Sequence, residues 1–172
     1  MSRRFRPVLA IFATATLLPL TSSSPGAQSP SATAETRHLT LTTSATPAAA
    51  TAARQRVVLN VDVALKQKMH VYAPDQPKDQ DYMPIALTVA PGDAYQLLSP
   101  RYPPSEKLFF APLKETQHVY SKGFRITQPI VVTGELNAPL TITGTVRYQA
   151  CDDVLCYVPQ TVAVKWEIRN GR

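Results

Sequence analysis

The chain contains two cysteines, Cys151 and Cys156, with four residues between them. Two thiols this close along a chain can form a disulfide, and a disulfide that opens and closes transfers two electrons by thiol–disulfide exchange. This chemistry requires that the two sulfurs are held within bonding distance and that a second disulfide can reach one of them. The flanking sequence must therefore satisfy both conditions.

The segments on either side of the cysteines alternate as half-buried β-strands do. The intervening Asp-Asp-Val-Leu is a plausible hairpin loop, and facing Cα atoms in a hairpin lie about 4.5–5.5 Å apart, close to what a disulfide needs. We therefore expect Cys151 and Cys156 to bridge at the mouth of a hairpin, near the surface. The residues expected on one face are Leu140, Ile142, Gly144, Val146 and Tyr148 in the first strand and Val162, Val164, Trp166 and Ile168 in the second.

Two interpretations of this pair remain open from the residues alone. A structural disulfide closing a six-residue loop would contribute only about 2 kcal/mol in the chain-entropy model, and a domain of this size does not depend on such a crosslink. A redox pair would use the accessible rim of the hairpin. Asp152 and Asp153 disfavour a thiolate at either cysteine, so the reduced pair is expected to be sluggish until a partner docks.

The N-terminus has the organisation of a secretory signal. Arg3, Arg4 and Arg6 precede an apolar run from Val8 to Leu20, which is shorter than the roughly 20 residues of a spanning helix. We predict a signal peptide over residues 1–27, with an uncleaved anchor as the alternative. In either case the body of the protein lies outside the cytoplasm, where disulfides form and turn over. The remaining basic excess of the 172-residue chain is too small and scattered to indicate nucleic-acid binding.

Composition divides the rest of the chain into two parts. Residues 28–54 are rich in Ala, Ser and Thr with little periodicity and are predicted to be a flexible linker, within which Leu39–Thr42 could form a short edge strand. From residue 55 to 172, seven to nine short alternating segments are separated by turn signals, and no segment has a helical pattern. This pattern predicts an all-β domain, an immunoglobulin-like antiparallel β-sandwich.

The cysteine segment carries a resemblance to a known family. Residues 148–160, Tyr-Gln-Ala-Cys-Asp-Asp-Val-Leu-Cys-Tyr-Val-Pro-Gln, resemble the active-site hairpin of the N-terminal periplasmic domain of DsbD, the thiol:disulfide interchange protein. The segment Met69–Ala73 resembles an early His/Tyr-containing strand of that family, and His118–Tyr120 resembles the segment that follows its cap loop. The loop between the cysteines is one residue shorter than in the best-known members. The family fold is an immunoglobulin-like sandwich.

The resemblance implies a role as an electron relay. In the family, this domain takes electrons from a membrane-linked, thioredoxin-like reductant and hands them to periplasmic thiol oxidoreductases, including partners in cytochrome c biogenesis. It implies that Cys156 forms the mixed disulfides and that Cys151 resolves them, without metal or other cofactor. The expected activity is that of a protein-disulfide reductase, with thioredoxin-fold proteins and a membrane thiol reductant as partners. The alternative is an immunoglobulin-like binding or scaffold domain with a structural disulfide.

A surrounding set of site residues is expected in addition to the catalytic pair. In the segment Leu108–Glu115, one of Phe109, Phe110 and Leu113 could shield the disulfide and move away on docking, or these residues could simply be packed. A soft-metal site, such as one for Cu(I), made by Met69, His70 and the cysteines is a minor alternative. The expected surround consists of His70, Tyr72, Phe109, Phe110, Leu113, Asp152, Asp153 and Tyr157.

Overall fold

The structure is a computed structural model that describes residues 31–48, 55–77, 82–111, 114–134, 136 and 138–169. The predicted signal peptide and Leu113 lie outside these ranges. None of the described segments forms an apolar helix of membrane-spanning length.

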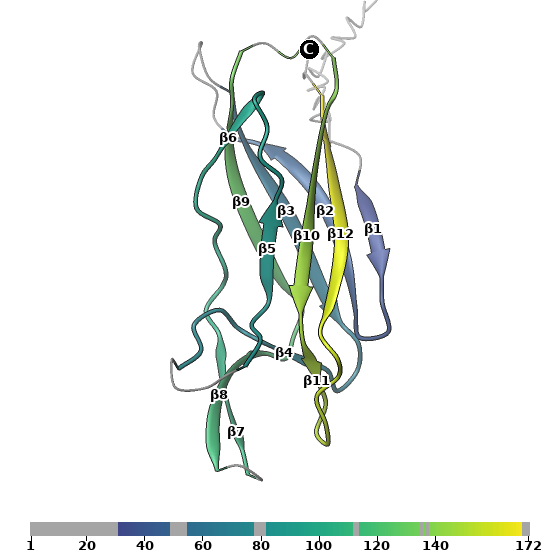
Figure 1. Cartoon of the computed structure of the whole chain (residues 1–172), viewed down its shortest axis with the longest axis vertical. Coiled ribbons are helices and arrows are strands. Elements are labelled where there is room, and N and C mark those ends of the chain that lie inside the picture. Colours follow the sequence, from purple (N-terminus) through teal and green to yellow (C-terminus); the bar gives the residue numbers. More distant parts are fainter. Residues whose placement is uncertain are drawn as a thin grey trace, which may run out of the picture.

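The main body consists of two antiparallel sheets that face each other, with a third, smaller sheet at one end (Figure 1). The predicted immunoglobulin-like β-sandwich is therefore confirmed. The first sheet runs in the order β1 (Ala32–Glu35), β2 (Leu39–Pro47), β3 (Gln55–Leu65), β9 (Phe124–Val132) and β6 (Tyr95–Leu97). The second runs β12 (Gln160–Ile168), β10 (Leu140–Tyr148) and β5 (Ala86–Val89), and the third β11 (Ala150–Cys151), β4 (His70–Tyr72), β8 (Glu115–Tyr120) and β7 (Glu106–Phe110).

The core between the two large sheets follows the alternation expected from the sequence. Ile142, Val146 and Tyr148 of β10 are buried, whereas the residues between them are exposed or half-buried. The indole of Trp166 on β12 is 1% exposed, and its Nε1 donates a hydrogen bond of 2.9 Å to the backbone oxygen of Asn60 on β3. This bond joins the two sheets through a buried polar contact.

The prediction of a flexible linker over residues 28–54 is wrong for the part of this segment that the structure describes. Residues 32–35 and 39–47 form β1 and β2, and β2 pairs with β3 along its whole length, from Leu39↔Leu65 to Pro47↔Val57. The prediction failed because Thr and Ser occupy many positions, which lowers the mean hydropathy, although Leu39 and Leu41 are fully buried. The suggested edge strand at Leu39–Thr42 is longer than expected and lies one strand in from the edge.

The small sheet and the cysteine hairpin lie together at one end of the sandwich. β10 and β12 pair from Leu140↔Ile168 to Tyr148↔Gln160, and the chain beyond this last pair projects past the large sheets (Figure 1). Here β11 leaves the second sheet and pairs with β4, placing Cys151 opposite His70. The β7–β8 hairpin extends from the same end (Figure 1), and β4 joins it to β11 within the small sheet.

Candidate active site at the disulfide

Cys151 and Cys156 form a disulfide across a tight hairpin, and their Cα atoms lie 4.0 Å apart. The loop is closed by a hydrogen bond of 3.0 Å from the Asp152 amide to the Leu155 oxygen, and by one of 2.8 Å from the Tyr157 amide to the Ala150 oxygen. The hairpin expected from the sequence is thus formed around Asp-Asp-Val-Leu. The two sulfurs meet the distance condition for a bond that can be broken and remade.

The two cysteines differ sharply in exposure. Cys151 is 1% exposed because its side chain packs with those of Tyr72 and Val119, whereas Cys156 lies beyond the loop and is exposed. Both were expected near the surface, and only Cys156 is. A partner can therefore reach Cys156 directly, while Cys151 is protected behind it.

The hydroxyl of Tyr72 is a hydrogen-bond donor placed at the two sulfurs. Its oxygen lies 3.3 Å from Cys156 Sγ and 3.5 Å from Cys151 Sγ. Disulfide sulfurs carry no hydrogen, so the tyrosine must donate. Burial, with smaller contributions from Tyr82 and Glu115, raises the pKa of Tyr72 to about 12, which keeps this proton in place at neutral pH.

A group of polar residues that sequence reasoning missed holds Tyr72 in position. The ring of Tyr82 stacks on that of Tyr72 with centroids 4.3 Å apart and an interplanar angle of 20°. The Tyr82 hydroxyl donates to the Glu115 carboxylate and accepts a bond of 3.0 Å from Gln117 Nε2. Tyr82 follows a polar loop, and Glu115 and Gln117 lie in a strand without a distinctive motif. No local sequence pattern therefore identified these three residues as part of the site.

The disulfide lies in a cleft of about 190 Å³ between the cysteine hairpin and the β7–β8 hairpin. Of the expected surround, His70, Tyr72, Phe110 and Asp152 line it. Phe109 does not, and it is 63% exposed. The lining consists of His70, Tyr72, Tyr82, Phe110, Gln117, Cys151, Asp152, Val154, Leu155 and Cys156.

Asp152 organises the loop between the cysteines. Its carboxylate accepts hydrogen bonds from the Leu155 amide at 2.9 Å, the Tyr157 hydroxyl at 2.7 Å and the Val154 amide at 2.8 Å. These three donors favour the ionised form and lower the pKa of Asp152 to about 2. The carboxylate is therefore a fixed negative charge beside the cysteines. Asp153 is exposed and does not line the cleft.

Tyr157 supports the loop from outside the cleft. Its ring packs on His38 with centroids 4.5 Å apart, and the Arg37 guanidinium lies 5.8 Å from the ring centroid. Within the described residues, neither ring nitrogen of His38 has a hydrogen-bond partner, so this buried side chain acts as a packing surface. Arg37 and His38 fall in the segment expected to be linker, which is why their contact with the hairpin was not foreseen.

Replacing Tyr157 with Phe is expected to raise the pKa of Asp152 toward its ordinary value of 3.8, because one of its three donors is lost. A folded-state pKa below the unfolded one stabilises the protein above that unfolded value, and this contribution is lost as the pH falls toward 2. Carboxyl-carbon NMR titration measures the shift. An unchanged pKa would show that the two backbone amides alone account for the depression.

His70 is the only imidazole among the residues that line the cleft. It is 7% exposed, and its ring lies edge-on to that of Tyr72, with centroids 6.3 Å apart. Burial lowers the pKa of His70, and the charges of Asp153 and Asp152 partly oppose this shift. His70 is therefore neutral at pH 7. In the described part of the chain, no group of three or more His, Cys, Asp or Glu residues is placed to hold a metal ion.

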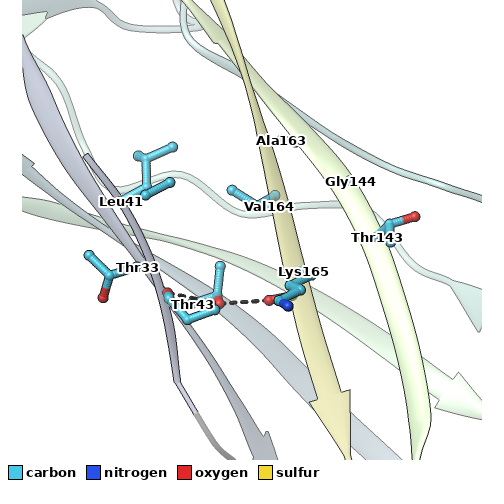
Figure 2. A pocket seen from close by; sticks show the side chains of 10 residues that line it. Thr33, Leu41, Thr43, Thr143, Gly144, Ala163, Val164 and Lys165 are labelled. Atoms are coloured by element: carbon cyan, nitrogen blue, oxygen red, sulfur yellow. Dashed lines mark hydrogen bonds between the residues drawn. The ribbon is translucent and has the colours of Figure 1, made fainter. Parts of the chain in front are cut away.

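A second hollow of about 290 Å³ lies at the far edge of the sandwich, where β1 and β2 meet β10 and β12 (Figure 2). Its walls are mainly small and apolar, and the Thr43 hydroxyl spans it with a bond of 2.7 Å to the Lys165 oxygen. Lys165 is its only titratable lining residue. Since it holds neither cysteine, we place the candidate active site at the disulfide.

The family model described as "Thiol:disulfide interchange protein DsbD, N-terminal" matches residues 37–167. The chain belongs to this family. The matched region includes the cysteine hairpin and the cleft, and it begins in the β1–β2 loop. The DsbD N-terminal family thus includes β2, in agreement with the extended domain boundary that the structure shows.

Solved structures resemble the chain at low identity. The N-terminal periplasmic domain of ScsB from Proteus mirabilis is 12% identical with a TM-score of 0.53, over 83% of this chain and 51% of that one. This chain therefore spans about half the length of that structure. The reduced DsbD N-terminal domain of Neisseria meningitidis is 21% identical with a TM-score of 0.40, over 66% of this chain and 78% of that one. Among curated proteins, no sequence matches the chain.

Proposed function

We propose that this domain relays two electrons between thiol proteins by opening and closing the Cys151–Cys156 disulfide. The observation that carries the proposal is the asymmetry of the pair. One cysteine is exposed, the other is 1% exposed, and a buried tyrosine hydroxyl lies within 3.5 Å of both sulfurs. A structural crosslink requires neither the accessible sulfur nor the donor.

The exchange has two steps in the direction that reduces a partner. The Cys156 thiolate attacks the partner's disulfide, which forms a mixed disulfide and releases one partner sulfur as a thiolate. Cys151 then attacks Cys156 Sγ, so that the Cys151–Cys156 bond forms and the partner's second sulfur leaves. The domain loses two electrons and the partner gains them. Reduction of the domain runs through the same steps in reverse.

The cleft supports the first step by stabilising the charge on sulfur. In the reduced protein the Tyr72 hydroxyl, which burial keeps protonated, can donate a charge-assisted hydrogen bond to the Cys156 thiolate. Asp152 acts in the opposite sense because its fixed charge repels a thiolate. The free domain is therefore expected to exchange slowly until a partner docks against the loop.

Replacing Tyr72 with Phe is expected to raise the pKa of the Cys156 thiol by about 1–2 units, since a hydrogen bond to a charged group contributes about 1.5–3 kcal/mol. The thiolate fraction falls accordingly, but the remaining thiolate is more nucleophilic, so exchange at pH 7 should slow by roughly 3–10-fold.

The pH dependence of Cys156 alkylation measures this shift. Tyr120→Phe is the matched control, because Tyr120 also has a pKa raised to about 12 by burial and donates to the Pro103 oxygen outside the cleft. An equal thiol pKa in wild type and Tyr72→Phe would contradict the assigned role.

The proposed partners are thioredoxin-fold proteins and a membrane-linked thiol reductant of the periplasm. The family membership, the described periplasmic origin of the ScsB domain and the predicted signal sequence support this location. The rim around Cys156 supports a protein partner, because Val154 and Val158 are 82% and 81% exposed and Leu155 is 49% exposed. Apolar side chains this exposed beside a reactive sulfur are suited to contact another protein.

Trapping of mixed disulfides tests the proposal. A Cys151→Ser variant retains the accessible cysteine but cannot resolve, so it should accumulate covalent adducts with thioredoxin-fold proteins in the periplasm. The matched Cys156→Ser variant retains only the buried cysteine and should give few adducts. If neither variant formed reducible adducts, the scaffold alternative would be supported. If Cys156→Ser formed more adducts than Cys151→Ser, the roles of attacking and resolving cysteine would be reversed.

A further inference from the structure

The resolving step requires Cys151 to lose a proton inside the protein. Cys151 is 1% exposed, and burial in apolar surroundings disfavours a thiolate. Solvent reaches this thiol poorly while a partner covers Cys156. A proton acceptor within the cleft would remove this obstacle.

The structure places His70 directly across from Cys151. The two are register partners in the antiparallel β4–β11 pair, so their side chains project from the same face with Cβ atoms about 4.5–5.5 Å apart. Both line the cleft. Tyr72, two residues further along β4, independently supports the placement of His70 beside Cys151. Its ring centroid is 6.3 Å from that of His70, and its hydroxyl is 3.5 Å from Cys151 Sγ.

The other titratable groups facing this position are unsuited to accept the proton. Tyr72 is protonated with a pKa of about 12, and Tyr82, on which it stacks, also has its pKa raised by burial. Asp152 has a pKa of about 2 and is already occupied by three donors. Asp153 is exposed and lies outside the lining of the cleft.

We propose that His70 is the general base that takes the thiol proton of Cys151 as this residue attacks the mixed disulfide. The inference rests on the proposed function and adds a catalytic residue to it. The Cys151 S–H bond breaks and its proton moves to an imidazole nitrogen. The Cys151 Sγ–Cys156 Sγ bond forms, and the bond from Cys156 to the partner breaks with both electrons leaving on the partner's sulfur. The imidazolium then returns its proton to the leaving thiolate or to water.

The charge state of His70 suits this role. Burial lowers its pKa, so the ring is neutral at pH 7 and can accept a proton. Asp153 and Asp152 raise that pKa again and stabilise the imidazolium once it forms. A neutral imidazole whose protonated form is stabilised by nearby carboxylates has the properties of a general base.

The chromogenic aromatic disulfide DTNB isolates the step in the full-length reduced protein. Attack by Cys156 releases the first thionitrobenzoate, and attack by Cys151 releases the second, which leaves as a thiolate without needing a proton. His70→Asn is expected to slow the second release on the order of 100-fold at pH 7, with the first release changed little. His118→Asn is the control, because that ring bonds Asp75 at 3.2 Å and does not line the cleft.

The pH profile separates a base from a packing residue. The wild-type rate of the second release should be level around neutrality and fall in acid as His70 takes up a proton, whereas the rate of His70→Asn should climb with hydroxide across the whole range. Free imidazole should restore much of the second release in His70→Ala. An unchanged rate and profile in His70→Asn would overturn the proposal.

Two further results would also decide the role of His70. If the His70 variants fold poorly, Asp153→Asn in the otherwise native protein should move the acid limb to lower pH, and an unmoved limb would contradict the assignment. If the wild-type protein shows no first release and traps no partner, the proposed function itself fails. A normal first release with an unaffected second release in His70→Asn overturns only the role of His70.

Discussion

In the reduced protein, Cys156 is expected to react with iodoacetamide on the order of 100-fold faster than Cys151. The reason is burial: Cys151 is 1% exposed and packed with Tyr72 and Val119, whereas Cys156 is exposed beyond the loop. A buried thiol reacts only through local opening, and an opening free energy of about 2.7 kcal/mol corresponds to a 100-fold slower reaction. The effect is large because one thiol is packed against Tyr72 and Val119 and the other faces solvent.

Mass spectrometry of peptides from a timed alkylation series measures the two rates in one sample. Protein unfolded in urea is the control, and there the two thiols should react at similar rates. Equal rates in the folded reduced protein would contradict the division into an attacking and a resolving cysteine. A faster Cys151 would exchange the two roles.

Replacing Leu41 with Ala is expected to lower the free energy of unfolding by about 2–5 kcal/mol, the usual cost of emptying a fully buried leucine site. Leu41 is 0% exposed in β2, paired with Val63 of β3. Urea unfolding followed by the fluorescence of Trp166, the chain's one tryptophan and itself 1% exposed, measures the change.

The neighbouring Thr42 supplies the matched control. Its side chain is half-buried on the opposite face of β2, so Thr42→Ala should cost well under 1 kcal/mol, or roughly 0.5 kcal/mol, as surface substitutions do. If Leu41→Ala were equally mild, the assignment of residues 39–47 to the packed core would be contradicted.

The elements around the cysteines could be predicted because their signals are local. Alternation in residues 140–148 and 160–168 indicates which side chains are buried, and the short Asp-Asp-Val-Leu segment between the cysteines indicates the hairpin loop. β2 was predicted only in part, as a short edge strand over Leu39–Thr42, because threonine fills most positions between Leu39 and Ala45. Thr43 is 2% exposed and bonds across to Lys165, which shows that tertiary pairing determined this strand more than its hydropathy.

The chemistry of the site depended on contacts that sequence cannot supply. Cys151 is buried because Tyr72 and Val119, which are far away in the chain, pack against it. Two adjacent phenylalanines could not be told apart until the β7–β8 hairpin was seen, and only Phe110 lines the cleft. Tyr82 reaches the site from a loop, by stacking on Tyr72. Such distant contacts leave no periodic signal.

The reduction potential of the Cys151–Cys156 pair tests the central claim most directly. It is measured by equilibrating the purified domain with defined ratios of reduced and oxidised glutathione or dithiothreitol and quantifying the free thiols by alkylation. An electron relay predicts a value between about −270 and −180 mV, the range of thioredoxin and disulfide isomerases, in which exchange with both donors and acceptors is possible. A potential below about −300 mV would identify a bond that resists reduction and would contradict the relay.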